Sequence, residues 1–268
     1  MLVLDPVDAT SSASIVAKAA AQKIPVISYD RLILGAPVDY YVSFDNEKVG
    51  KLQGQALLDK LTADGNAGKT IVMINGSPTD NNATLFKAGA HSILDGKVKI
   101  GAEYDTPDWS PDKAQTEMDQ AITKLGKAGF VGVLAANDGT GGGAIAAMKG
   151  AGIDQKTRPT TGQDAELAAI QRILLGEQYM TVYKAIKLEA EAAAELAVSL
   201  AKGEAPPSSM TLSKVNNGSN DVDSVLLAPV AVTIENIKDT VVADGFWTTA
   251  QILTTPELKT AGAAVGLQ

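Results

Sequence analysis

Short apolar runs alternate with longer stretches of helical periodicity along most of the chain. Examples of the apolar runs are Ile24–Ser28, Thr70–Ile74 and Phe130–Ala135, each followed by a segment with helical spacing of apolar residues. Strands separated by helices of about ten or more residues indicate parallel β-α-β units. The runs are continuously apolar, which is typical of strands covered on both faces. The sequence therefore predicts an α/β, doubly wound fold.

The same patterns give the positions of the expected elements. We expect strands at Leu2–Leu4, Ile24–Ser28, Asp39–Phe44, Thr70–Ile74, Val98–Tyr104, Phe130–Ala135 and Tyr179–Val182. We expect helices at Ser12–Gln22, Asn46–Leu61, Asp80–Leu94, Pro111–Leu125, Gly142–Gly150, Ala165–Leu175 and Ala185–Ala201. The tail departs from this rhythm: Glu204–Asn220 is rich in Pro, Ser and Asn and predicts a surface loop, Val225–Val232 is apolar again, and Thr254–Gln268 is expected to be peripheral.

Charge and cysteine content exclude several classes of function. Lys plus Arg total 23 and Asp plus Glu total 31, so the net charge is −8, and no basic block stands out. Nucleic acids and anionic membranes both reward clustered positive charge, so we expect neither as a partner. The chain has no cysteine, which excludes disulfides, thiolate metal sites and a cysteine nucleophile. No stretch approaches the roughly 20 apolar residues of a membrane span.

Polar side chains follow almost every predicted strand, where ligands of open α/β sheets bind. They include Arg31, Asn82, Trp109, Asn137, Asp164 and Lys184. Sugar hydroxyls both donate and accept hydrogen bonds, and planar amide, carboxylate and guanidinium groups can bridge two of them. An indole offers an apolar plate for the C–H face of a pyranose. This set predicts a sugar site and needs no group with a shifted pKa.

Each of these residues also has a structural interpretation. Asp80 and Asp138 stand where helix N-caps belong, and capping alone could explain them. Asn82 could be an ordinary surface residue of a first helical turn. Arg31 could form a surface ion pair with Asp30, and Trp109 could fill the core. That all the loops share one chemistry favours the sugar interpretation.

Signals for catalysis or for a cofactor are weak. The segment Asn137–Gly143 is rich in glycine but lacks the ends of a phosphate loop and the spacing of a dinucleotide fingerprint. His91 is the single histidine and falls within a predicted helix in a polar stretch, so we interpret it as a surface residue. We expect no enzyme activity, no cofactor and no metal site.

Six segments at these same loops resemble a known family. They are Tyr29–Arg31, Ser43–Gly50, Gly76–Ala83, Asn137–Asp138, Gly162–Ala165 and Met180–Lys184. In this order they resemble the periplasmic sugar-binding proteins of ABC importers with the type I two-lobed fold, most closely the xylose-binding members. The resemblance runs from Met1 to about Phe246.

The resemblance implies two α/β lobes that close over one monosaccharide, D-xylose or a close pentose or hexose, and then dock on ABC permease subunits. It implies an extracytoplasmic location and contact with the membrane only through the permease. The lobes would be 1–45 with 184–226 and 46–183 with 227–268, with hinge crossings near 44–46, 182–184 and 227. Sugar contacts would come from Arg31 in the first lobe, Lys184 at a hinge crossing, and Asn82, Trp109, Asn137 and Asp164 in the second lobe.

The resemblance also predicts a departure at the amino terminus. Family members carry a β-α-β segment of roughly sixty residues, about two βα units, before the point where Met1 falls. The chain as given shows neither this segment nor an export signal, so we expect an incomplete first lobe with an unpaired strand edge. We expect its sugar affinity to fall well below that of an intact relative.

Two other functions share parts of this pattern. The effector lobe of a LacI-type transcription regulator has the same fold, with its DNA-binding helices upstream, but the long tail, the acidic charge and the xylose-type motifs argue against it. A sugar-converting α/β enzyme is disfavoured because a second histidine, a metal cluster and a nucleophile elbow are lacking.

Overall fold

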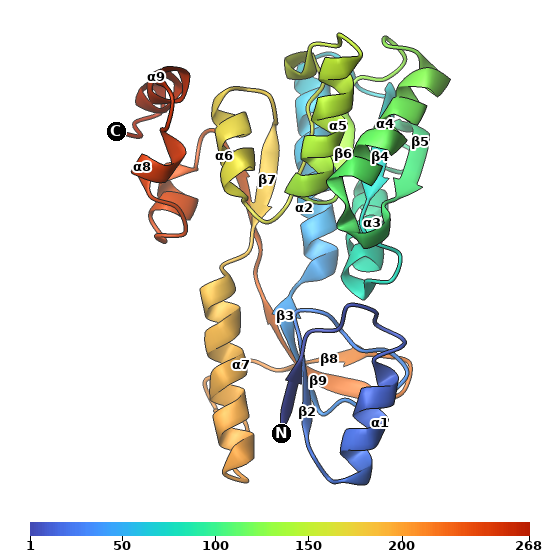
Figure 1. Ribbon diagram of the computed structural model, residues 1–268, viewed down its shortest axis with the longest axis vertical. Coiled ribbons are helices and arrows are strands. Elements are labelled where there is room, and N and C mark those ends of the chain that lie inside the picture. Colours follow the sequence, from blue (N-terminus) through green and yellow to red (C-terminus); the bar gives the residue numbers. More distant parts are fainter. The chain divides into compact units, whose positions relative to one another are not determined.

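The computed structural model describes residues 1–268, and the chain divides into two compact units (Figure 1). Unit 1 comprises Met1–Asn46, Thr79–Thr84 and Ala185–Pro229. Unit 2 comprises Glu47–Pro78, Leu85–Lys184 and Val230–Gln268. Both units are α/β, as the alternation of apolar runs and helices predicts.

Unit 1 contains a mixed sheet with the strand order β1-β2-β3-β9-β8. Its strands are β1 (Leu2–Leu4), β2 (Val26–Tyr29), β3 (Tyr40–Phe44), β8 (Ser213–Asn216) and β9 (Asp221–Leu227). The first four strands in this order pair in parallel, and β8 pairs antiparallel with β9.

Helices α1 (Ala13–Ala21) and α7 (Ile186–Ala201) cover opposite faces of this sheet (Figure 1). Successive strand residues point to opposite faces, so an apolar run serves both helices. Val26 packs in one core cluster with α1, and the next residue, Ile27, packs in another with α7. Unit 1 therefore has a core on each side of its sheet.

Unit 2 is built on β4 (Thr70–Asn75), flanked by β5 (Lys99–Asp105) and β6 (Val133–Ala135), all parallel. A bridge between Val133 and Thr160 and backbone hydrogen bonds from 160–162 to the next strand extend this row. That strand, β7 (Met180–Tyr183), pairs antiparallel with β10 (Val230–Thr233).

Two helix layers enclose the unit 2 sheet. Ile71 and Met73 of β4 pack with α2 (Asn46–Ala63) and α3 (Asn81–Leu94). The alternate residues of the strand pack on the other face, with α4 (Pro111–Leu125) and α5 (Asp138–Gly150). The remaining elements are η1 (Pro107–Trp109), η2 (Gln155–Thr157), α6 (Leu167–Leu174), η3 (Lys238–Val242), α8 (Thr249–Ile252) and α9 (Pro256–Ala264).

Helix boundaries follow capping chemistry. Helix α4 has the predicted bounds: Pro111 occupies the first turn, the Ser110 side chain accepts from the Lys113 amide, and Gly126 (φ 78°) follows the end. Helix α5 begins at Asp138 rather than at the predicted Gly142. The reason is a capping box, in which Asn137 Oδ1 accepts from Thr140 N at 2.8 Å and the Asn137 amide donates to Thr140 Oγ1.

The predicted surface loop Glu204–Asn220 is wrong for residues 213–220, nearly half of the segment, which form β8 and the turn to β9. Asn217 in this turn is 1% exposed, and its Nδ2 donates to the carbonyls of Ile33 and Ala36. The tail segment Thr254–Gln268 contains α9, with Leu258 and Leu267 buried. The structure contains no helix with the length and apolar character needed to cross a bilayer.

Candidate functional site

Four of the predicted ligand residues lie at the carboxyl ends of unit 2 strands. Trp109 ends η1 after β5, Asn137 follows β6, Asp164 follows the strand-like segment at Thr160, and Lys184 follows β7. Parallel strands place their carboxyl ends at one edge of a sheet, so these side chains share one edge of unit 2.

An ion pair joins two of these residues directly. Lys184 Nζ lies 3.3 Å from Asp164 Oδ1, and the two side chains are 13% and 35% exposed. The same ammonium lies 5.9 Å from the centre of the Phe86 ring. The partly exposed carboxylate can accept hydrogen bonds from hydroxyl groups of a ligand, and the largely covered ammonium can donate to them.

Asn137 lies beside this pair because the backbone joins the two loops. The Asp138 amide donates to the Gln163 carbonyl at 2.9 Å. Asn137, which precedes Asp138, is therefore close to Asp164, which follows Gln163. Asn137 Oδ1 is engaged in capping α5, but its amide group carries two further donors. The capping interpretation and the ligand interpretation of Asn137 are therefore compatible.

The Trp109 ring lies directly on the backbone of Gly76. A Cβ atom at Gly76 would come within 2.0 Å of the Trp109 indole, so only glycine fits there. Phe86 supports the indole edge-on, with ring centres 6.2 Å apart. The indole is half-buried in a small aromatic cluster and is positioned as an apolar plate at this edge.

Arg31 in unit 1 pairs with Asp80 rather than chiefly with Asp30. Arg31 Nε lies 2.8 Å from Asp80 Oδ2 and 3.9 Å from Asp30 Oδ2. Asp80 Oδ1 also accepts from the backbone amide of Asn82. One oxygen of the Asp80 carboxylate therefore caps α3, while the other orients the Arg31 guanidinium. The planar guanidinium keeps further donors for a ligand.

Asn82 is a node of the unit 1 hydrogen-bond network and is 2% exposed. Its Oδ1 accepts from Asn46 Nδ2 at 2.9 Å and from the Tyr41 hydroxyl, and its Nδ2 donates to the Asp30 carbonyl at 3.0 Å. These bonds place residues 79–84 with unit 1, whereas the sequence analysis expected Asn82 in the second lobe. One amide hydrogen remains for a ligand.

Burial is the main reason why the pKa of the Tyr41 hydroxyl lies well above its usual value. Tyr41 is therefore a neutral donor in this network. The carbonyl of Asp30 accepts from Tyr41, from Ser43 and from Asn82, and the Asp30 backbone has a φ of 56°. The network fixes the turn that leads into Arg31.

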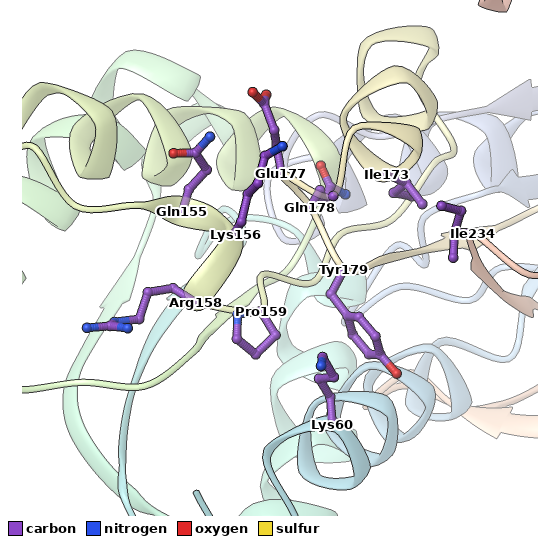
Figure 2. A pocket seen from close by; sticks show the side chains of 11 residues that line it. Lys60, Gln155, Lys156, Arg158, Pro159, Ile173, Glu177, Gln178, Tyr179 and Ile234 are labelled. Atoms are coloured by element: carbon purple, nitrogen blue, oxygen red, sulfur yellow. The ribbon is translucent and has the colours of Figure 1, made fainter. Parts of the chain in front are cut away.

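A hollow of about 170 Å³ lies at the opposite, amino-terminal ends of the unit 2 strands (Figure 2). Tyr179, which immediately precedes β7, forms one wall beside Lys60. Two of the charged groups here have partners within the protein: Lys60 pairs with Asp64 at 2.7 Å, and Glu177 pairs with Lys149 at 2.9 Å. The predicted ligand residues Trp109, Asn137, Asp164 and Lys184 lie at the other edge of the sheet.

Backbone strain marks the same loops. Six non-glycine residues have positive φ, and five of them are Asp30, Asp108, Trp109, Asp164 and Ala165. These five are predicted ligand residues or their immediate chain neighbours. Left-handed backbone is unfavourable for L-residues and concentrates at binding sites, where the surrounding structure enforces it. The pattern supports the sites at Arg31, Trp109 and Asp164 independently of their side-chain chemistry.

Comparisons with known proteins identify the family of the chain. Residues 1–205 match the family model of the periplasmic binding protein domain. The D-xylose-binding periplasmic protein of Escherichia coli is 44% identical over 251 residues, which cover 92% of this chain and 73% of that protein. The chain belongs to the periplasmic binding protein family.

Other members of the periplasmic binding protein family are similar to this chain in sequence and in structure. The D-xylose-binding periplasmic protein of Haemophilus influenzae is 42% identical over 94% of this chain and 74% of its own length. A solute-binding protein of an ABC transporter from Clostridium phytofermentans, solved with β-D-glucose bound, superimposes with a TM-score of 0.86 at 31% identity and covers 94% of this chain and 82% of that one. The predicted type I fold is confirmed.

Sequence reasoning missed several residues around the site of this periplasmic binding protein. It treated Asp138 as a possible N-cap, but Asn137 is the cap and Asp138 is fully buried. It assigned nothing to Tyr41, Phe86 or Trp247, which support the loops through contacts between distant segments. Only the scarcity of aromatic residues, 4% of the chain, could have drawn attention to them.

Proposed function

We propose that the protein captures a monosaccharide, D-xylose above all, and delivers it to the permease of an ABC importer. The observation that carries the proposal is the edge of unit 2, where the Asp164–Lys184 ion pair adjoins the Asn137 amide and the Trp109 plate stands over Gly76. Xylose is favoured among sugars because both D-xylose-binding relatives exceed 40% identity.

Each side chain has a role that fits a pentose. Asp164 accepts hydrogen bonds from sugar hydroxyls, while Lys184 and the Asn137 amide donate to them. Trp109 stacks on the C–H face of the ring. Within unit 1 itself, Arg31 carries a planar guanidinium that can bridge two hydroxyls, and Asn82 carries one further amide hydrogen.

Binding without turnover suits this set of groups. Hydrolysis or isomerisation of a sugar needs a proton donor or acceptor tuned to its task, a metal or a nucleophile beside the ligand. Here the carboxylate at the edge is already paired with an ammonium at 3.3 Å. We expect the sugar to leave chemically unchanged, in an extracytoplasmic compartment where an importer collects it.

A thermal-shift panel tests the proposal. A ligand at one hundred times its Kd adds about 2.7 kcal/mol to the free energy of unfolding, which raises Tm by several degrees in a protein of this size. We expect the largest shift with D-xylose among D-xylose, D-ribose, L-arabinose, D-glucose and D-fructose, and no change in the recovered sugar by chromatography. Equal and negligible shifts with all five sugars would contradict the proposal.

A further inference from the structure

The turn that presents Asp164 combines two strained residues. Asp164 has a φ of 93° and the buried Ala165 has a φ of 49°. Neither residue is a glycine, so both conformations must be enforced by their surroundings. Three separate parts of unit 2 supply hydrogen bonds to this turn.

Strand β7 holds the turn from one side. The Asp164 amide donates to the Val182 carbonyl at 2.8 Å, and the Val182 amide donates to the Gly162 carbonyl at 3.1 Å. The Ala165 amide donates to the Thr181 hydroxyl at 3.2 Å. The strained pair is thus joined to the strand that ends at Lys184.

Asp138 is bonded to the residue that ends the turn, Glu166. Its carboxylate accepts from the Glu166 amide at 2.9 Å, from Thr181 Oγ1 at 2.9 Å and from Gln178 Nε2 at 2.7 Å. All three partners are donors, so both carboxyl oxygens of Asp138 act as acceptors. Burial, and next the nearby Asp164, raise the pKa of Asp138, whereas the bonds from Gln178, Glu166 and Thr181 act in the opposite direction.

Trp247, in the tail of the chain, is bonded to Ala165 in the turn. Trp247 Nε1 donates to the Ala165 carbonyl at 2.8 Å. The Trp247 ring contacts Phe246 edge-on with centres 5.4 Å apart, and Phe246 contacts Tyr183 in the same way at 5.1 Å. The Tyr183 hydroxyl in turn donates to Asp244. The indole donor is therefore fixed to the end of β7.

We propose that Asp138, Thr181 and Trp247 are positioning residues that hold the strained Asp164–Ala165 turn in its ligand-binding conformation before the sugar arrives. The inference rests on the proposed function, because it assumes that the Asp164 carboxylate contacts the sugar. Holding a binding group in advance removes an ordering cost from association, so these three residues raise affinity without touching the ligand.

Four variants separate positioning from general stability. Trp247→Phe removes the indole donor and keeps the ring; Thr181→Val removes the hydroxyl at constant volume, whereas Thr181→Ser retains it. Gln171→Met is the matched control, because Gln171 Nε2 bonds the tail at the Ile252 carbonyl without touching the turn. By calorimetry we expect Trp247→Phe and Thr181→Val to weaken D-xylose binding about tenfold, and Thr181→Ser and Gln171→Met to stay within twofold of the wild type. Wild-type affinity in the first pair overturns the inference.

A double-mutant cycle tests whether Trp247 acts through Asp164. If it does, Trp247→Phe costs about tenfold in the wild type but less than twofold in an Asp164→Asn background. An equal loss in both backgrounds overturns the inference, since a merely structural role acts regardless of residue 164.

Hydrogen exchange of the peptide spanning 162–167 gives a readout independent of sugar: exchange should accelerate in Trp247→Phe and be unchanged in Gln171→Met. If the wild type binds no sugar while exchange responds as expected, the proposed function fails and the hold on the turn stands.

Discussion

At the scale of single residues, the contact between Trp109 and Gly76 requires glycine at position 76. Gly76→Ala would place a methyl group 2.0 Å from the indole, so the ring must move. We expect D-xylose affinity to fall at least tenfold and the free energy of unfolding to fall by about 1–3 kcal/mol, the usual range for overpacking. Calorimetry and urea unfolding measure the two effects.

Gly150→Ala is the matched control for this substitution. A Cβ at Gly150, the last residue of α5, meets nothing within 4 Å. Alanine there should leave sugar affinity unchanged and keep or slightly raise stability, because glycine costs a helix about 0.5–1 kcal/mol. A loss of affinity in Gly150→Ala equal to that in Gly76→Ala would show that any added methyl group disturbs the site.

His91 gives unit 2 a pH-dependent contribution to stability. Its imidazole contacts Asp95 through Nδ1 at 2.8 Å and Glu103 through Nε2 at 3.0 Å, while Lys87 pairs with the same Glu103 and with Asp105. Partial burial lowers the pKa of His91, but the hydrogen bonds to Glu103 and Asp95 outweigh burial and hold this pKa above its usual value of 6.5.

A raised folded-state pKa means that the imidazolium stabilises the fold below pH 6.5 and that this stabilisation disappears as the pH rises through the folded pKa. We expect His91→Gln to lower the free energy of unfolding at pH 5.5 by at most about 1 kcal/mol, because the pair is partly solvated. At pH 9 wild type and variant should differ less. A larger difference at pH 9 than at pH 5.5 would reverse the sign and contradict this account.

At the scale of elements, the turn between β8 and β9 is bonded to residues 33–36, within unit 1. Asn217 donates to the carbonyls of Ile33 and Ala36 and accepts from the amides of Ser219 and Asn220. Asn217→Ala leaves buried carbonyls unsatisfied, and we expect a loss of about 2–3 kcal/mol in the free energy of unfolding.

The neighbouring Asn216→Ala serves as its control, because Asn216 is exposed and bonds only within the turn. We expect Asn216→Ala to change the free energy of unfolding by less than about 1 kcal/mol. Equal losses in the two variants, measured by urea unfolding, would mean that the bonds within the turn, and not those to Ile33 and Ala36, carry the stability.

Elements with local signals could be predicted from the sequence, and those made by distant pairing could not. The apolar run that becomes β4 and the proline that opens α4 are visible in the chain itself. Strand β8 could not be predicted because its own segment has the composition of a loop. It forms a strand through pairing with β9. For the site, the rule of strand ends found Asp164 and Lys184, but the bonds that place Asn82 in unit 1 and Trp247 against Ala165 join segments far apart in sequence.

At the scale of the whole molecule, two α/β units each carry polar groups at strand ends and backbone strain at the loops that present them. The acidic chain, with a net charge of −8, suits a small neutral ligand better than an anionic polymer. The relatives of this chain include sugar-binding periplasmic proteins, and we propose that the groups around Asp164 and Trp109 contact the sugar.

The central claim is that this protein binds D-xylose through the edge of unit 2. Titration calorimetry with D-xylose on the wild type, Asp164→Asn, Lys184→Met and the Gly150→Ala control tests it most directly. We predict saturable binding of one sugar per chain, a loss of at least tenfold in Asp164→Asn and in Lys184→Met, and wild-type affinity in Gly150→Ala. Absence of saturable binding to the wild type, or unchanged binding in both site variants, would contradict the claim.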